Sequence, residues 1–233
     1  MSDISIRWIG QSGYILGDAN TEICIDPYLS NVVDRVAGRG RMVEAPFSPE
    51  ELRSNIVICS HDHLDHVDID AIPLMNKENM VFLAPTHAEK TLKKCGVEKF
   101  VPFDEGAIFE NGGFKITAVF ADHSVPAIGI IVEYGDITLY FTGDTEYNET
   151  LCELKNRKID IMFICINGKL GNMNVDEAVS LTKIISPRVG VPTHYGMFES
   201  NTEDPQKYLS QLDCGFEMKY NIKYSAKEIL KNV

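Results

Sequence analysis

The chain of 233 residues carries a formal net charge of −12, and 44% of its residues are hydrophobic. This composition is typical of a globular protein with a sizeable core, and the length predicts a single domain over residues 1–233. The negative charge argues against nucleic acid as a partner, because a polyanion would be repelled.

Membrane association and disulfide bonding are not expected either. No apolar stretch approaches the length needed to span a bilayer, and residues 1–5 lack the basic start of a signal peptide. The six cysteines are irregularly spaced and include no Cys-x-x-Cys pair. These features predict a reduced, cytoplasmic protein.

The chain begins with a β pattern. Residues 4–9 alternate between apolar and polar side chains, as a half-buried strand does, and a glycine-containing turn follows at 10–13. Apolar runs at 14–16 and 22–26 predict two more strands. Such a meander, without a helix, predicts an antiparallel sheet.

Residues 28–49 differ from their surroundings, because they hold two glycines, two prolines and the basic side chains Arg35, Arg39 and Arg41. Two interpretations stay open for this segment. It is either a long loop or short helix close to the functional site, or a disordered surface excursion.

Helices and strands alternate after this segment. The predicted elements of the middle are a helix at 70–76, a strand at 80–83, a helix at 86–95 with a Thr86 cap, and strands at 114–119, 128–134 and 137–141. Gly135-Asp136 joins the last two strands and indicates a hairpin. The predicted elements of the final third are a strand at 159–165, a helix at 175–185 capped by Asn174, a strand at 188–191 and a helix at 204–212. This order favours two sheets packed face to face with helices outside.

A short polar turn, residues 61–66, follows an apolar run at 55–60 that predicts a buried strand. It reads His-Asp-His-Leu-Asp-His. Neutral imidazole offers a lone pair near pH 7, so this spacing can supply ligands for two adjacent divalent ions. A solvated polar loop is the alternative interpretation.

Three more side chains of ligand type each come just after a predicted strand, and four such strand ends can share one rim of a sandwich. The candidate metal ligands are therefore His61, His63, Asp65, His66, His123, Asp144 and His194. Imidazoles mixed with carboxylates suit two divalent ions, Mn²⁺ or Zn²⁺ first and iron next. His87 lies in a predicted helix without a neighbouring ligand type and is predicted to be a surface residue.

The motif His61-x-His63-x-Asp65-His66, followed in order by His123, Asp144 and His194, resembles the metallo-β-lactamase superfamily over nearly the whole chain. The resemblance implies an α/β (α+β) fold, a four-layer αββα sandwich of two mixed β-sheets flanked by helices. It implies a first metal held by His61, His63 and His123, a second held by Asp65, His66 and His194, and a bridge through Asp144. Asp26 resembles an acid that supports the metal loop from behind.

A narrower resemblance concerns the substrate. Ile166-Asn167-Gly168, Gly171-Asn172-Met173 with Glu177-Ala178, and residues 191–198 are similar to the bacterial L-ascorbate-6-phosphate lactonases. That family opens L-ascorbate 6-phosphate and uses manganese. The shorter length of this chain leaves the exact substrate open.

These observations predict a metal-dependent hydrolase that opens a lactone or ester bond of a small, phosphorylated sugar-acid substrate with a metal-bridging hydroxide. Asp65 and Asp144 are the expected catalytic carboxylates, and Tyr195 is a candidate oxyanion donor with ordinary packing as its alternative. The candidate substrate contacts are Asn167 and Asn172 for hydroxyls, and Arg39, Arg41 and Lys169 for a phosphate.

Other interpretations remain open at this point. They are a phosphodiesterase of the same fold, a redox di-iron protein, and a non-catalytic metal-binding regulatory module. Di-iron relatives place a Glu where His63 stands and append a flavin domain. A homo-oligomer is expected from base rates and from the lactonase resemblance.

Overall fold

Two mixed β-sheets form the centre of the computed structural model, which describes residues 4–231. In spatial order the first sheet contains β13 (Lys223–Ser225), β1 (Ser5–Gly10), β2 (Gly13–Gly17), β3 (Glu22–Ile25), β4 (Ile56–Ile58), β5 (Val81–Ala84) and β6 (Phe100–Pro102). The second contains β12 (Val189–Thr193), β11 (Ile161–Cys165), β10 (Ile137–Phe141), β9 (Ile128–Tyr134), β8 (Phe114–Phe120) and β7 (Ile108–Asn111).

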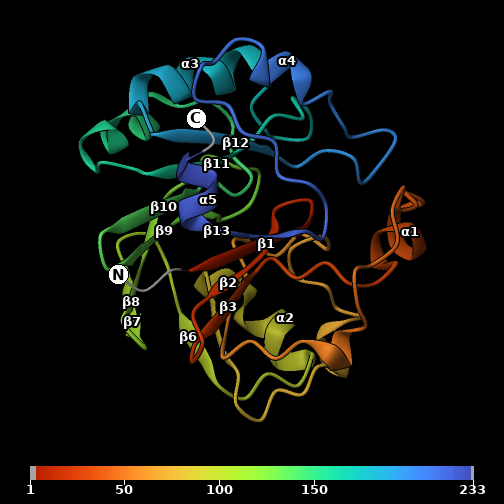
Figure 1. Cartoon of the computed structure of the whole chain (residues 1–233). Coiled ribbons are helices and arrows are strands. Elements are labelled where there is room, and N and C mark those ends of the chain that lie inside the picture. The colour runs from red at the N-terminus through yellow and green to blue at the C-terminus, as the bar shows by residue number, and fades with distance from the viewer. Residues whose placement is uncertain (1–3, 232–233) are drawn as a thin grey trace.

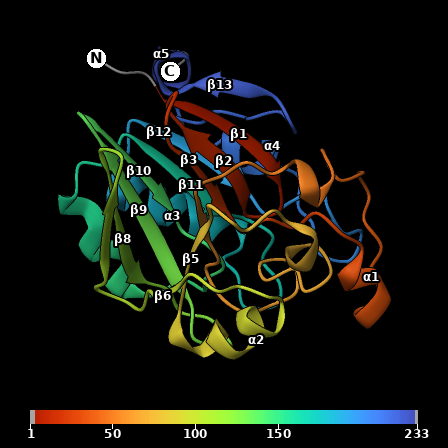
Figure 2. The ribbon, with the colours of Figure 1, turned by 90° about the horizontal axis from the view of Figure 1, so that it is seen from below.

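Helices surround this pair of sheets. They are α1 (Val32–Ala37), α2 (Glu89–Lys94), α3 (Val175–Ile185), α4 (Gln206–Leu209) and α5 (Ala226–Lys231), with 3-10 helices at Pro49–Glu51, Ile72–Leu74, Thr86–Ala88 and Glu149–Asn156. Figure 1 shows α3 and α4 above the sheets and α2 below them, and Figure 2 gives the perpendicular view. The predicted αββα sandwich is confirmed.

The core follows from the alternation of side chains along each strand. Ile23 and Ile25 of β3 face the second sheet and join the core between the sheets. Cys24, between them, points the opposite way and packs with Phe82 and Leu92 under α2. Alternate residues of a strand point to opposite faces, so a strand that is apolar throughout is covered on both sides.

Strand direction decides which loops can meet. In the first sheet β3 to β6 pair in parallel, and β1 runs the same way because two antiparallel pairings separate it from β3. In the second sheet β10 to β12 pair in parallel, and β8 runs the same way for the same reason. The loops after these strands therefore leave their sheet at a common edge. A hydrogen bond from Ile128 N to Ser60 O, 3.0 Å, joins the two sheets at that edge.

Several predicted elements are confirmed in detail. The side chain of Asn174 accepts a hydrogen bond from Glu177 N at 3.0 Å, and the Glu177 carboxylate accepts one from Asn174 N at 2.9 Å, so α3 begins with a capping box. The Gly135-Asp136 turn joins β9 to β10, with Tyr134 paired to Ile137. β1, β2 and β3 are antiparallel neighbours, as the opening meander predicts.

Two predicted helices are shorter than expected. The 70–76 helix is only the 3-10 turn Ile72–Leu74, which contains Pro73 and ends at the extended residue Met75. Asp68 Oδ1 accepts hydrogen bonds from Asp70 N and Ala71 N just before this turn. The 204–212 helix is shortened at both ends to α4, which runs from Gln206 to Leu209. Asp204 Oδ1 accepts a hydrogen bond from Gln206 N, which accounts for the later start.

The remaining corrections concern caps and short elements. The Thr86 cap is wrong, since the Thr86 hydroxyl donates to Asp104 Oδ2 and the first turn is 3-10. β6, β7, β13, α5 and the 149–156 helix were not predicted from the sequence. β7 is mostly exposed, so its sequence lacks the apolar run of a buried strand. No helix in the described part of the chain is long and apolar enough to cross a membrane.

Candidate metal centre

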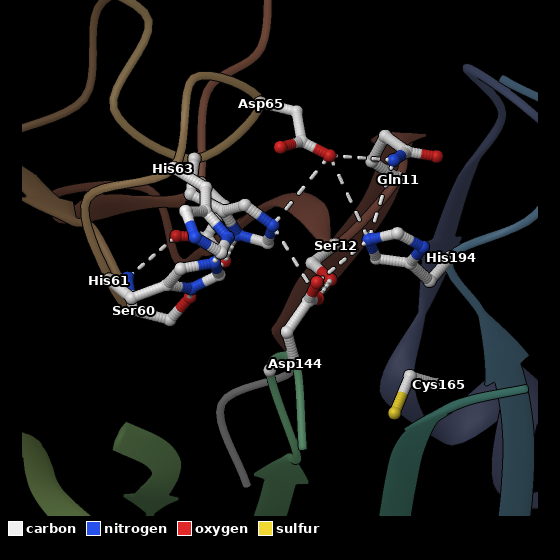
Figure 3. A network of polar contacts seen from close by, with 12 residues as sticks. Gln11, Ser12, Ser60, His61, His63, Asp65, Asp144, Cys165 and His194 are labelled. Atoms are coloured by element: carbon white, nitrogen blue, oxygen red, sulfur yellow. Dashed lines mark hydrogen bonds and ion pairs between the residues drawn. The ribbon is translucent and has the colours of Figure 1, made fainter. Parts of the chain in front are cut away.

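The predicted ligands lie together at the edge where both sheets end, as Figure 3 shows for five of them. The loop after β4 supplies His61, His63, Asp65 and His66, and the loops after β8, β10 and β12 supply His123, Asp144 and His194. The common direction of these strands is what brings side chains so distant in sequence into one place.

Three imidazoles form the first donor group. The Nδ1 atom of His63 lies 3.0 Å from His61 Nε2 and 3.2 Å from His123 Nε2. The other ring nitrogen of His123 donates to Gly171 O at 2.9 Å, which leaves Nε2 as a free lone pair. Burial lowers the pKa of His61 well below its usual value and also lowers that of His63. Neutral imidazoles facing one another suit a divalent cation between them.

The second donor group is Asp65, His66 and His194, whose ligand atoms lie within 4.8 Å of one another. His66 Nδ1 donates to Asp26 Oδ2 at 2.8 Å. Its Nε2 atom is buried and has no hydrogen-bond partner among the described residues. A carboxylate behind a histidine fixes the tautomer that presents the other nitrogen to a metal.

Asp144 connects the two groups, because its ligand atom, that of His61 in the first group and that of His66 in the second all lie within 4.8 Å of one another. Its Oδ1 is 3.5 Å from His66 Nε2, and its Oδ2 is 3.1 Å from His194 Nε2. Ser12 Oγ donates to Oδ1 at 3.2 Å, and Asn172 Nδ2 donates to Oδ2 at 2.9 Å. Both carboxylate oxygens are therefore held in place by the protein.

The negative charge of the carboxylates in and beside the second group favours cation binding. Burial alone would raise the pKa of Asp144, but His194 and His66 outweigh it and hold that pKa well below its usual range. Burial alone would lower the pKa values of His66 and His194, but Asp144 and its neighbouring carboxylates outweigh it and raise both. The directions of these pKa shifts show that positive charge beside Asp144 is favourable, and divalent cations would supply such charge. The donor set fits metal binding.

Asp26 lies behind the 61–66 loop, where the sequence places it. Its Oδ1 accepts from Ser60 N at 2.7 Å, and its Oδ2 accepts from Ser60 Oγ at 2.8 Å as well as from His66. The carboxylate is fully buried. It therefore fixes both the start of the loop and the orientation of one imidazole.

A pocket of about 460 Å³ opens onto the donor groups. Its walls include His63, Asp65, Asp144 and His194, the polar side chains Arg39, Ser124 and Asn201, and the apolar side chains Val33, Leu64, Leu170 and Phe198. The 28–49 segment thus carries a short helix, α1, and contributes Val33 and Arg39 to the pocket.

The other two predicted cations lie outside the pocket walls. The Arg41 guanidinium is 4.4 Å above the Tyr28 ring and donates to Tyr28 O and Ser30 O. Lys169 Nζ donates to Ser200 O at 3.2 Å. Arg41 therefore holds the 28–49 segment in shape.

The predicted amides take positions behind the pocket. Asn172 donates to Asp144 and also to Asn167 Oδ1, at 3.0 Å. Asn167 in turn donates to Asn201 Oδ1 at 2.8 Å. This chain of amides links the pocket wall at Asn201 to the carboxylate of Asp144.

Tyr195 does not line the pocket. Its ring centroid lies 4.9 Å from that of Trp8, within the core between the sheets. Burial raises the pKa of its hydroxyl, with smaller contributions from Glu217 and Tyr224. The structure therefore places it as a packing residue, which is the alternative that the sequence leaves open.

His87 is exposed, as predicted, although its Nε2 lies 3.3 Å from Asp62 Oδ2. Sequence reasoning missed Gln11, Ser12 and Asp68. Gln11 Nε2 donates to Asp65 Oδ2, and Asp68 accepts from Leu29 N and Ser30 N, which ties the 28–49 segment to the metal loop. The sequence does contain a signal for Gln11 and Ser12, because these polar residues follow β1 at the same edge of the sheet as the predicted ligands.

Comparison with known proteins agrees with this geometry. A family model described as a beta-lactamase superfamily domain matches residues 21–195. The UPF0173 protein PF0020 of Pyrococcus furiosus is 27% identical over 90% of both chains. A UPF0173 metal-dependent hydrolase of Methanosarcina mazei is 26% identical over 94% of this chain and 95% of its own. The structure of Igni18, a metallo hydrolase from Ignicoccus hospitalis, superposes with a TM-score of 0.79 at 20% identity, covering 96% of this chain and 98% of its own. The chain therefore belongs to the beta-lactamase superfamily.

Proposed function

We propose that this protein is a metal-dependent hydrolase that opens a lactone or ester bond in a small anionic substrate. The observation that carries the proposal is the pair of donor groups joined by Asp144 at the wall of a pocket of about 460 Å³. Relatives described as metal-dependent hydrolases over nearly their full length support it. Phosphorylated sugar-acid lactones are the first substrate class to test, because of the lactonase resemblance.

The proposed ligands are those of the two groups. His61, His63 and His123 would hold one ion, Asp65, His66 and His194 a second, and Asp144 both. Mn²⁺, Zn²⁺ and iron all accept this mixture of nitrogen and oxygen donors. Two adjacent divalent cations supply a hydroxide nucleophile near neutral pH and polarise the scissile carbonyl.

The chain's own residues would position the substrate and move its protons. Asp65 lines the pocket with one oxygen fixed by Gln11, so it can orient the attacking water and accept its proton. Arg39 stands at the wall as a fork-shaped donor for an anionic group. Leu64, Leu170 and Phe198 add apolar walls that exclude bulk water from the reacting bond.

The test is a metal analysis joined to an activity panel. Protein loaded with Mn²⁺ or Zn²⁺ is assayed against sugar lactone phosphates, simple lactones and esters, and an aryl phosphodiester. Hydrolysis of a lactone or ester supports the proposal. Turnover of the diester alone would identify a phosphodiesterase instead, and full metal loading without turnover on any substrate would identify a binding module.

Two substitutions test the ligand assignment. His63→Ala removes one donor of the first group, and Asp144→Ala removes the side chain between both groups, so we expect metal affinity to fall by more than about 100-fold. Activity should fall with it. Elemental analysis after dialysis measures the metal content, and His87→Ala is the control, since His87 is exposed and outside both groups. Wild-type metal content in both variants contradicts the assignment.

A further inference from the structure

Gln11 is fully buried against the second donor group, yet the donor set itself does not include it. We propose that Gln11 is a positioning residue that sets the metal affinity of the group formed by Asp65, His66 and His194. The inference rests on the proposed function in one respect, the presence of an ion at that group. It does not depend on which substrate is hydrolysed.

The side chain of Gln11 contacts two members of the group. Its Nε2 donates to Asp65 Oδ2 at 2.8 Å and lies 3.4 Å from His194 Nε2 (Figure 3). These two side chains come from the loop after β4 in one sheet and from the end of β12 in the other. One amide nitrogen thus spans the gap between the sheets at the ligands.

The orientation of the Gln11 amide follows from charge. An amide nitrogen only donates, whereas an amide oxygen against the Asp65 carboxylate would place two acceptors together. The observed orientation leaves Gln11 Oε1 buried without a hydrogen-bond partner in residues 4–231. A buried unpaired acceptor is unfavourable, so the donation to a charged carboxylate outweighs this cost.

The main chain of Gln11 fixes the same region independently. Its carbonyl oxygen accepts hydrogen bonds from Trp8 Nε1 at 2.9 Å, from Thr193 Oγ1 at 2.7 Å and from His194 N at 3.2 Å. These bonds hold the turn after β1 against the end of β12. These hydrogen bonds to the backbone do not involve the side-chain amide. A substitution of the Gln11 side chain therefore removes its contacts to the ligands and leaves the backbone contacts that support the fold.

The backbone conformation of Gln11 also indicates a specific role. Its φ is +49°, in the left-handed region that glycine adopts without steric cost. Gly10 and Gly13 flank it in the same turn, but a glutamine occupies this position. Strain of this kind is retained where the side chain that it directs is needed.

The decisive variants are Gln11→Met, which keeps the length and removes the donor, and Gln11→Leu, which removes the donor with a different apolar shape. We expect about 10- to 100-fold weaker binding of one Zn²⁺ or Mn²⁺ ion, with the other ion unaffected. Titration with each metal alone and elemental analysis measure the affinities. In a titration with Co²⁺, the visible bands of one of the two sites should appear only at higher Co²⁺ concentrations than in the wild type.

The matched control is Gln206→Met. Gln206 Nε2 donates to Glu217 Oε2 at 2.9 Å on the exposed surface, so the same chemical change is made far from the ligands. The effect of metal on the melting temperature distinguishes positioning of the ligands from a merely structural role of Gln11. The rise in Tm on adding metal should shrink in the Gln11 variants, and Gln11→His, which keeps a ring N–H donor, should restore part of it.

Two ions bound with wild-type affinities by both Gln11→Met and Gln11→Leu overturn the inference, and so does a wild-type protein that binds a single ion. If Gln11→Met does not fold, Gln11→Leu and Gln11→His carry the same comparison. The proposed function fails in a different way, through a protein that binds two ions and hydrolyses no ester or lactone. In that case the metal affinities of the Gln11 variants still test the role of Gln11.

Discussion

Three polar residues of the metal centre have left-handed backbone conformations. Gln11, Asp26 and His194 have φ values of 49°, 45° and 62°. Each directly follows a strand that ends at the common edge, so the chain turns sharply there and aims the side chain at the centre. Non-glycine residues adopt this conformation at a cost, and such residues concentrate at functional sites.

The contribution of Asp26 to metal affinity, which it makes through His66, can be measured by substitution. Asp26→Asn keeps the size of the side chain but removes the charge behind His66, so metal affinity should fall about 10- to 100-fold. Titration with Zn²⁺ checks this. Asp160→Asn is the control, because Asp160 also accepts a backbone hydrogen bond, from Thr138 N, but lies outside the donor groups. Equal affinities in the two variants would contradict the role given to Asp26.

At the scale of an element, the loop between β11 and α3 links the pocket to the first donor group. Gly168, Leu170 and Gly171 all have positive φ, and Leu170 stands exposed at the pocket wall. The next carbonyl, that of Gly171, fixes the His123 ring. This short loop therefore contributes both to the pocket wall and to the orientation of a ligand.

Substitution of Gly171 tests this loop. In Gly171→Ala the added Cβ would lie 2.8 Å from His123 Nδ1, so the ring must move and metal content should fall. Gly135→Ala is the matched control, because Gly135 also has a positive φ but has open space around it. Both variants should lose about 1 kcal/mol of stability from backbone strain. Chemical denaturation and elemental analysis separate the two effects, and intact metal content in Gly171→Ala would argue against the link.

At the scale of the whole molecule, two sheets meet at one edge and enclose carboxylates that need positive charge. Without metal, Asp144 and the neighbouring carboxylates outweigh burial and raise the pKa values of His66 and His194, which favours protons on these imidazoles. A histidine whose pKa is higher in the folded than in the unfolded state stabilises the fold. This stabilisation is complete at a pH below the unfolded-state pKa, about 6.5, and it is lost as the pH rises through the folded-state pKa. The stabilisation from Asp144, whose pKa is lowered, is lost only as the pH falls below about 3.9.

The stability of the metal-free protein should therefore decrease as the pH rises above about 6.5. Metal binding releases those protons, so the gain in Tm from Zn²⁺ or Mn²⁺ should increase with pH. Thermal unfolding between pH 6 and 9, with and without metal, measures this difference. A gain that shrinks with rising pH would show that these imidazoles are not protonated in the metal-free protein.

The sequence alone determined the features that depend on local pattern. Period-two alternation, the Asn174 capping box and the Gly135-Asp136 turn each specify their element without help from the rest of the chain. The spacing of residues 61–66 determined where the ligand types gather. The strands β6, β7 and β13 were missed because they contain three or four residues and owe their structure to pairing with a neighbour.

Only the tertiary structure decided which side chains face the pocket. Arg39 lines it while Arg41, two residues away, packs on Tyr28, and no local signal separates them. Gln11 and Ser12 reach the centre because strand pairing sets the direction of β1, which a linear sequence does not display. The reason is physical: propensity and capping act over a few residues, whereas the position of a side chain depends on packing between segments that are far apart in the chain.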